Sequence, residues 1–160
     1  MQIFFDTEFI DLGNTVLPIS IGLVREDGKT YYAEVFDTVK HYDRAVPWVQ
    51  ENVIKKLTGP VKPANLICDE IEDFVGKNPV FWAYYAAYDW FCLCSLYGGM
   101  LNVPSSWPNF CRELMQLKTD RIEKHGAIAA FLPRQKTPEH HALNDALWNL
   151  EAYVYLRYIK

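Results

Sequence analysis

Residues 1–24 read MQIFFDTEFIDLGNTVLPISIGLV, and this segment sets the class of fold. A short apolar run at residues 2–5 ends in Asp6, which predicts a strand with a carboxylate at its tip. Residues 16–24 and 30–36 are also strand-like, and the Glu-Asp-Gly-Lys segment between them is typical of a hairpin turn. The N-terminal part of the chain therefore predicts a meander of three antiparallel strands.

The remainder of the chain alternates helical and strand-like patterns. The spacing of apolar residues predicts helices over residues 46–57, 68–75, 89–97, 111–120 and 142–159. An aromatic-rich run at residues 79–84 predicts a buried strand, and the proline-containing residues 58–63 and 102–110 are expected to be loops. Together these patterns predict an α/β fold, with a mixed sheet and helices on its faces, in one domain over residues 1–160.

Composition narrows the class of protein. The chain has 160 residues, of which 50% are apolar and 22% charged, so it can fill one core and is not a disordered tail. Its formal charge of -4 argues against a DNA coat protein or a binder of anionic membranes, although bound divalent cations could let an enzyme accept a polyanion. The sequence has neither an 18-residue apolar run nor a basic, apolar leader, so we expect a cytoplasmic protein without membrane contact.

The four cysteines form no C-x-x-C pair, and two of them lie in the apolar segment WFCLCSLY. We therefore expect reduced thiols in the core rather than a zinc site. The cysteines are Cys68, Cys92, Cys94 and Cys111.

Carboxylates near the predicted strand and helix ends are the first candidates for chemistry. Residues two apart in a strand point to the same side, so Asp6 and Glu8 would project together and attract a hard cation such as Mg²⁺ or Mn²⁺. A D-x-E pair also arises by chance, but its position directly after an apolar strand favours a site. Asp89 opens an apolar helix, where it is either a further ligand or a helix cap.

Residues 139–145, EHHALND, lead into the last helix and contain a second candidate group. Within a helix, His141 and Asp145 would share a face because they are four residues apart. His140 would then lie about 140° away from Asp145. If the helix begins at about Ala142, however, His140 lies on a loop that can approach the acids. Both histidines could also be ordinary surface residues.

The order of these residues resembles the DEDDh 3'-to-5' exonucleases. The pattern has D-x-E on the first strand, an acid in mid-chain and H-x-A-x-x-D on a late helix, here Asp6, Glu8, Asp89, His140 and Asp145. Three segments resemble more closely the ribonuclease AS group of small bacterial exoribonucleases: FFDTEFIDLGNTVLPISIGLV, WAYYAAYDWFCL and FCRELMQL. The resemblance covers nearly the whole chain. One departure is Tyr85, where many superfamily members carry asparagine, which affects substrate details rather than activity.

The resemblance implies a ribonuclease-H-like fold in which four acids hold two Mg²⁺ or Mn²⁺ ions per active site. Asp6 would bridge the two ions, Glu8 and Asp145 would complete one site, and Asp89 would serve the second. His140 would accept the proton of the attacking water, because a histidine titrates near neutral pH. The expected reaction is an in-line displacement that releases nucleoside 5'-monophosphates.

The resemblance also implies a single-stranded RNA 3' end as substrate, a preference for adenylate-rich RNA, and a homodimer. The candidates for substrate contact are Thr7, Glu8, Phe9, Trp90 and Arg112. Phe9 could wedge under the terminal base by stacking, whereas core packing is the more typical role of Trp82, Tyr88 and Trp90. Six basic residues could contact phosphates, and the sequence does not rank them: Arg112, Lys118, Arg121, Lys124, Arg134 and Lys136.

Two other functions stay open on the sequence. The first is a 3'-5' DNA exonuclease, and the second is a catalytically inactive nuclease-like module that binds RNA. The intact acids and histidine argue against the inactive module, because converging carboxylates without cations would only destabilise the fold.

Overall fold

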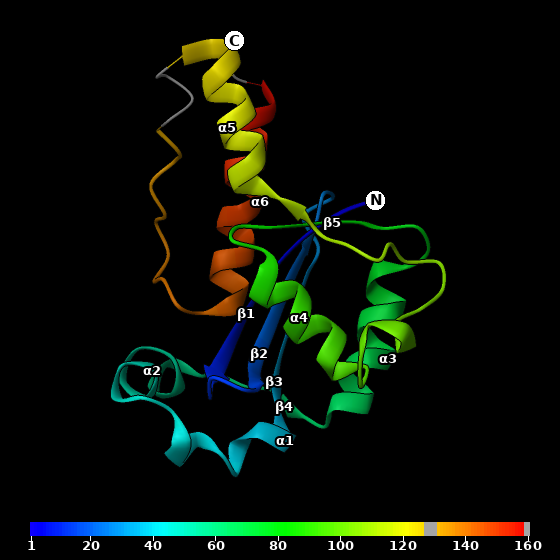
Figure 1. The fold of residues 1–160 in the computed structure, drawn as a ribbon, viewed down its shortest axis with the longest axis vertical. Coiled ribbons are helices and arrows are strands. Elements are labelled where there is room, and N and C mark those ends of the chain that lie inside the picture. Colours follow the sequence, from blue (N-terminus) through cyan, green and yellow to red (C-terminus); the bar gives the residue numbers. More distant parts are fainter. Residues whose placement is uncertain (127–130, 159–160) are drawn as a thin grey trace.

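The computed structural model describes residues 1–126 and 131–158 (Figure 1). Within these residues, one mixed sheet has the strand order β4-β3-β2-β1-β5-β6. The strands are β1 (Gln2–Asp11), β2 (Val16–Arg25), β3 (Thr30–Val35), β4 (Val61–Lys62), β5 (Val80–Ala83) and β6 (Arg112–Glu113). Strands β1, β2 and β3 are antiparallel, whereas β4, β5 and β6 each pair in parallel with a neighbour. The predicted meander and mixed sheet are therefore confirmed.

Helices cover both faces of this sheet. They are α1 (Phe36–Val39), α2 (Pro47–Asn52), α3 (Ala64–Val75), α4 (Ala87–Leu96), α5 (Leu114–His125) and α6 (Ala142–Tyr158). The described residues also form the short 3-10 turns η1 (Tyr42–Arg44), η2 (Ile54–Lys56) and η3 (Met100–Asn102). Helix α6, with α5 beside it, covers one face, and α3 and α4 cover the other (Figure 1). Among the described residues, no helix is both long and apolar enough to cross a membrane.

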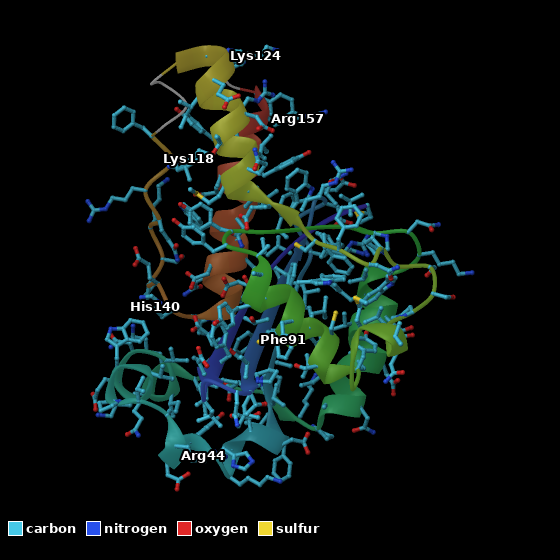
Figure 2. The ribbon with its side chains drawn as sticks, viewed as in Figure 1. Arg44, Phe91, Lys118, Lys124, His140 and Arg157 are labelled. Atoms are coloured by element: carbon cyan, nitrogen blue, oxygen red, sulfur yellow. The ribbon has the colours of Figure 1, made fainter. Side chains whose placement is uncertain are left out.

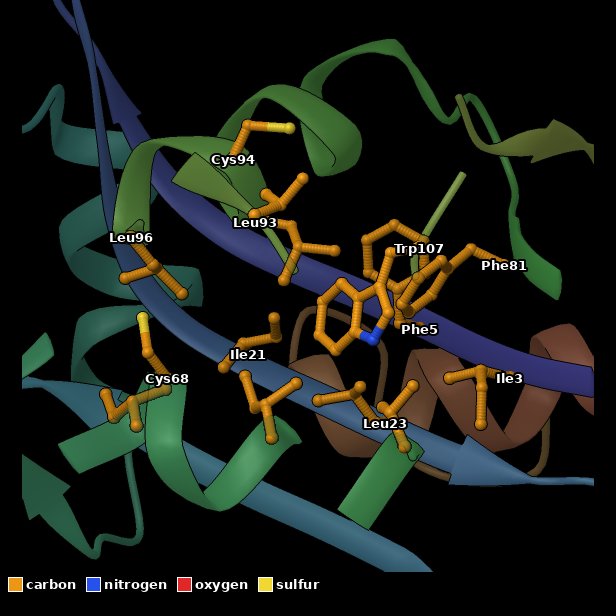
Figure 3. Packing of buried hydrophobic residues seen from close by; sticks show 14 of the residues in the cluster. Ile3, Phe5, Ile21, Leu23, Cys68, Phe81, Leu93, Cys94, Leu96 and Trp107 are labelled. Carbon is orange, nitrogen blue, oxygen red and sulfur yellow. The ribbon is translucent and has the colours of Figure 1, made fainter. Parts of the chain in front are cut away.

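The side chains of β1 alternate between the two faces. Ile3 and Phe5 are fully buried in the core with α3 and α4, which Figure 3 shows from close by. Phe4 is buried on the opposite face, in the cluster that includes α6. Because strand side chains repeat every two residues, Asp6 and Glu8 follow Phe4 and lie on the α6 face.

Gly22 of β2 allows the start of α6 to lie directly on the sheet. A Cβ atom at this position would come within 2.4 Å of the backbone of Ala142 and Leu143. Gly22 is also the cross-strand partner of Asp6. The close approach therefore places the first turn of α6 beside the first acid.

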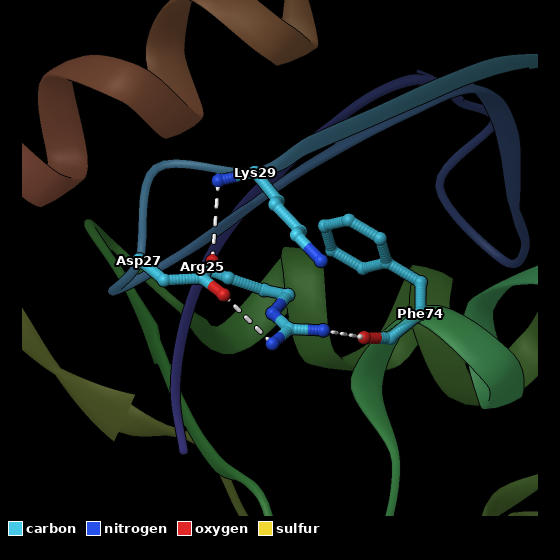
Figure 4. A network of polar contacts seen from close by, with 4 residues as sticks. All are labelled: Arg25, Asp27, Lys29 and Phe74. Atoms are coloured by element: carbon cyan, nitrogen blue, oxygen red, sulfur yellow. Dashed lines mark hydrogen bonds and ion pairs between the residues drawn. The ribbon is translucent and has the colours of Figure 1, made fainter.

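The β2–β3 hairpin is anchored to the end of α3 by a small polar network (Figure 4). The guanidinium of Arg25 donates to Asp27 at 2.8 Å and to the carbonyl of Phe74 at 3.2 Å. Gly28 adopts a φ of 86°, which the tight turn requires and which glycine accepts without steric cost. The predicted hairpin is confirmed.

Several predicted boundaries are wrong. Strand β1 continues to Asp11, so Asp6 lies inside the strand rather than at its tip. Asp6 nevertheless lies beyond the end of the adjacent β5, which pairs with β1 only as far as Phe4. The helix expected over residues 46–57 is broken at Val53, where the backbone (φ -115°, ψ -67°) separates α2 from η2.

Three further corrections follow from pairing and packing. The loop expected over residues 58–63 contains the short strand β4, which pairs with β3. The helix expected over residues 111–120 begins at Leu114, because Arg112 and Glu113 pair with β5 instead. Helices α3 and α4 both begin earlier than predicted. The expected start of α6 at Ala142 is confirmed.

The four cysteines are free thiols, and the predicted core position is confirmed for all except Cys111, which is only partly buried. Cys68, Cys92 and Cys94 are buried, and burial raises the pKa of Cys68 to about 11. A buried thiol with a raised pKa remains protonated at neutral pH and behaves as a small apolar side chain.

Candidate active site

Three of the predicted site residues converge at the start of α6. One potential ligand atom from each of Glu8, His140 and Asp145 lies within 4.8 Å of the other two. Asp6 lines the same pocket as His140 and Asp145. These acids come from β1 and α6, which are distant in sequence. Gly22 of β2, the cross-strand partner of Asp6, lets the start of α6 lie directly on the sheet.

Asp89 reaches the same group from α4, on the other face of the sheet. Its Oδ1 accepts hydrogen bonds from the backbone N–H of Thr7 at 2.8 Å and from the Thr7 hydroxyl at 2.7 Å. Asp89 is therefore not the cap of α4, whose N-cap residue is Ala86 without a side-chain hydrogen bond. Its negative charge raises the pKa of Asp6, which places the two carboxyls in one electrostatic group.

Burial makes all four carboxyls costly to ionise, and the charges of neighbouring acids add to this cost for Asp6, Glu8 and Asp89. Burial, followed by the charges of Asp89, Glu8 and Asp145, raises the pKa of Asp6 well above its usual value. Burial and two neighbouring acids raise the pKa of Glu8 to about 8, and burial raises that of Asp89 to about 6. The pKa of Asp145 is also raised by burial, although hydrogen bonds from Gln135 and His140 oppose the shift.

This donor set fits a hard divalent cation. Mg²⁺ and Mn²⁺ prefer carboxylate oxygens, and a bound cation would offset the repulsion that adds to the raised pKa of Asp6, Glu8 and Asp89. Within the described residues, the cluster of potential ligand atoms at Glu8, His140 and Asp145 contains no cysteine. Glu8, His140 and Asp145 could hold such a cation, and Asp6 lines the same pocket.

The two histidines have different surroundings. His140 precedes α6 with a positive φ of 64°, and its backbone N–H donates to Asp145 Oδ2 at 2.9 Å. Its ring meets the ring of Trp48 edge-on at 4.7 Å. The ring of His141 instead stacks on Tyr32 at 4.5 Å, and its Nε2 lies 3.2 Å from the hydroxyl of Thr58. The structure thus brings His140 to the acids and directs His141 away from them.

Among the residues that line the pocket, the sequence analysis missed Tyr84, Gln135 and Trp148. Gln135 Nε2 donates to Asp145 Oδ1 at 2.5 Å, and a pocket of about 470 Å³ beside the acids is also lined by Tyr84, Tyr85, Arg134 and Trp148. Gln135 and Arg134 belong to residues 131–141, which we call the strap and which has no regular secondary structure. Such a segment has no hydrophobic period that could have indicated its position.

Lys56 is a further residue that the sequence analysis did not find. Its charge lowers the pKa of Glu8, against the stronger effects of burial and neighbouring acids. Its Nζ lies 3.4 Å from the carbonyl oxygen of Glu139, next to His140. Turn η2 therefore brings a positive charge to the edge of the acid group.

The stacking candidates separate into exposed and packed residues. The rings of Phe9 and Tyr88 are stacked at 5.0 Å with an interplanar angle of 10°, and Tyr88 is 48% exposed. Trp82 is only 8% exposed, and Trp90 packs against the core on the α4 side. Thr7 is buried, with its hydroxyl bound to Asp89.

The basic candidates are also dispersed. Arg112 lies over the ring of Trp82 at 5.4 Å and lines a different groove, together with residues of β1, α5 and α6. Figure 2 shows Lys118 and Lys124 on α5, at the end of the molecule away from His140. Of the six, Arg134 lines the acid pocket.

Comparison with known proteins identifies the family of this chain. The family model described as the 3'-5' exoribonuclease Rv2179c-like domain matches residues 1–156. The chain belongs to this family. Two relatives in Mycobacterium tuberculosis are named 3'-5' exoribonuclease Rv2179c (strain H37Rv) and 3'-5' exoribonuclease MT2234.1 (strain CDC 1551). Each is 41% identical over 154 residues, which cover 91% of this chain and 87% of the relative.

A solved structure supports the fold of this Rv2179c-like chain. The crystal structure of the zinc-bound complex of E. coli ExoI with single-stranded DNA aligns with a TM-score of 0.64 at 11% identity. The alignment covers 98% of this chain and 40% of the ExoI chain. The expected ribonuclease-H-like mixed sheet with helices on both faces is confirmed.

Proposed function

We propose that this Rv2179c-like chain is a metal-dependent 3'-to-5' exoribonuclease of the DEDDh type. It releases nucleoside 5'-monophosphates from the 3' end of single-stranded RNA. The observation that carries the proposal is the convergence of Glu8, His140 and Asp145, with Asp6 in the same pocket and Asp89 in the same electrostatic group. The relatives named as 3'-5' exoribonucleases support the substrate and the direction.

The acids and His140 have separate tasks in this proposal. Asp6, Glu8, Asp89 and Asp145 hold two Mg²⁺ or Mn²⁺ ions, which when bound supply Lewis-acid activation of water and stabilise the departing oxygen. His140 accepts the proton of the attacking water as a general base.

Contacts around His140 support this assignment. The backbone hydrogen bond to Asp145 and the edge-on contact with Trp48 keep the imidazole at the acids. Gln135 restrains the same carboxylate of Asp145 from the strap.

The end of the RNA is held beside β1. Phe9 follows Glu8 in the chain, and its ring is already supported by the stacked ring of Tyr88. In the proposal, Phe9 stacks on the terminal base and Glu8 faces the terminal ribose. An aromatic face accepts any base, which suits an enzyme that processes ends.

We extend the proposal to the remaining implications of the resemblance. These are a single catalytic domain over residues 1–160, membership of the ribonuclease AS group, a preference for adenylate-rich RNA, a homodimer and a cytoplasmic location. The charge of -4 fits an enzyme whose cations, rather than its side chains, offset much of the substrate charge at the reacting phosphate.

The direct test is an exonuclease ladder. Poly(A), mixed-sequence RNA and single-stranded DNA, each labelled at the 5' end, are incubated with the protein and Mg²⁺ or Mn²⁺. We expect shortening from the 3' end on RNA and none with Asp6→Asn. Internal cuts would contradict the proposal, and faster degradation of DNA would identify a DNA exonuclease instead. An inactive module would show neither cleavage nor a rise in melting temperature with Mn²⁺.

A further inference from the structure

Beside the acids, one wall of the pocket is a ladder of aromatic rings. Tyr85 is 65% exposed, and its ring meets that of Tyr84 at 4.6 Å. Tyr84 in turn meets Trp148 of α6 at 5.0 Å, and the indole N–H of Trp148 donates to the carbonyl of Pro133 in the strap at 2.8 Å. All three rings line the pocket that contains Asp6 and Asp145. The exposed ring of Tyr85 is therefore supported from behind by packed side chains.

The backbone of Tyr85 is held in a costly conformation. Its φ of 58° lies in the left-handed region, which a residue with a bulky side chain rarely adopts. The carboxylate of Glu113 in β6 accepts the N–H of Tyr85 at 3.0 Å and the N–H of Ala86 at 2.8 Å. Strain of this kind persists where the surrounding structure enforces it, and it is concentrated at functional sites. Here it fixes an aromatic ring at the mouth of the pocket.

The pocket has the size and the polar groups that a nucleotide requires. Its volume of about 470 Å³ lies within the range of small-ligand pockets. Arg134 lines it and can face a phosphate, and Asp6, Asp145 and His140 line the same pocket. The stacked pair Phe9–Tyr88 does not line this pocket, so the aromatic ladder is a second and separate stacking surface.

We propose that this pocket binds the penultimate nucleotide of the RNA, with its base stacked on Tyr85 and its phosphate facing Arg134. The assignment rests on the exoribonuclease function proposed above, in which Phe9 supports the terminal base. The reacting phosphate joins these two nucleotides, so an aromatic surface on each side would hold it at the acids. Tyr85 then contributes to binding and orientation through stacking, which is tolerant of base identity.

The test compares two RNA oligomers that differ only in whether the penultimate nucleotide carries a base or is abasic. The kcat/KM for release of the first nucleotide is measured with Mg²⁺ or Mn²⁺. We expect the wild type to prefer the intact RNA by about ten-fold or more, as base–aromatic stacking allows. Tyr85→Ala should lose this preference, and Tyr85→Phe should keep it.

The controls separate this proposal from the function on which it rests. An oligomer that is abasic at the third position from the 3' end should be cleaved like intact RNA. Tyr158→Ala, which removes an exposed ring at the far end of α6, should keep the wild-type preference. Equal rates of the wild type on both oligomers would overturn the subsite, as would a preference that survives in Tyr85→Ala. Failure of the wild type to cleave any RNA would instead overturn the exoribonuclease function.

Discussion

His140 illustrates how much of the site depends on single residues. Of the described residues other than glycine, Asn78, Tyr85 and His140 have a positive φ. Tyr85 and His140 both line the acid pocket. Each is held by a carboxylate that accepts its backbone N–H, from Glu113 and Asp145 respectively. The local strain is thus stabilised by specific hydrogen bonds at the places where a ring must face the pocket.

Replacement of His140 should affect activity, whereas replacement of His141 should affect stability. His140→Ala should lower kcat by about 100-fold or more, because it removes the proposed general base. His141→Ala should keep activity within a few-fold but lower stability by about 1 kcal/mol, through loss of the contacts with Tyr32 and Thr58. Single-turnover rates and thermal melts with and without Mn²⁺ measure both effects. The reverse pattern would assign the base to His141.

At the scale of elements, the contact between β2 and α6 assembles the site. Gly22 lets the first turn of α6 approach the sheet, and Asn149 of α6 donates to the carbonyl of Phe5 in β1 at 2.9 Å from a buried position. Because Asp145 lies in the first turn of α6 and Asp6 in β1, the distance between the two acids depends on this packing.

Gly22→Ala should damage both stability and activity. A methyl group 2.4 Å from the backbone of Ala142 cannot be accommodated without moving α6, and overpacking typically costs about 1–3 kcal/mol. The shift should also separate Asp145 from the other acids, so we expect at least a ten-fold loss of kcat. The matched control is Ser20→Ala, which lies on the same face of β2 as Gly22. This variant should change the melting temperature and kcat only slightly. A melting temperature and kcat of Gly22→Ala equal to those of the wild type would contradict this account.

At the scale of the whole molecule, the acids of the site couple stability to pH. A carboxyl whose pKa is raised by folding is harder to ionise in the native state than in the unfolded state. Below the pKa of the unfolded state it is protonated in both states and does not change the free energy of unfolding. The free energy of unfolding then decreases as the pH rises from the pKa of the unfolded state to the pKa of the folded state. For Glu8 this window extends from the usual 4.5 to about 8, and for Asp89 from 3.8 to about 6.

The melting temperature of the metal-free protein should therefore fall between pH 5.5 and pH 8.5. We expect a decrease of several degrees, since each kcal/mol shifts the melting temperature of a domain of this size by roughly 2–4 °C. Asp6→Asn should show a smaller decrease, because it removes one of the repelling charges. Scanning calorimetry in a chelator, repeated with added Mn²⁺, measures the effect. A pH dependence identical in the wild type and in Asp6→Asn would show that the acids do not repel one another.

The charge of the site also predicts its preference for RNA ends. An RNA with a 3'-phosphate should resist degradation, because the extra negative charge would face Glu8 where the terminal ribose is proposed to lie. Treatment of the same RNA with a phosphatase should restore degradation to the rate of a 3'-hydroxyl end. Equal rates before and after treatment would contradict this position of the terminal ribose.

Local sequence patterns were sufficient for much of the fold and indicated the candidate acids. The strands β1, β2, β3 and β5 were predicted because short apolar runs are bounded by turn residues, and α6 because apolar residues recur at helical spacing. The same-side placement of Asp6 and Glu8 follows from the geometry of one strand. The resemblance joined these two acids to Asp89, His140 and Asp145 in one pattern and gave each residue an expected role.

Contacts between residues that are distant in sequence determined the features of the site that local patterns did not predict. The pairing of Asp89 with Thr7, the strap that brings Gln135 and Arg134 to the pocket, and the support of Tyr85 by Glu113 all join separate elements. The start of α6 at Ala142 leaves His140 before the helix and beside the acids, a placement that the sequence left open between His140 and His141. Such contacts have no local period, because they depend on how completed elements pack against one another, and only the folded chain brings them together.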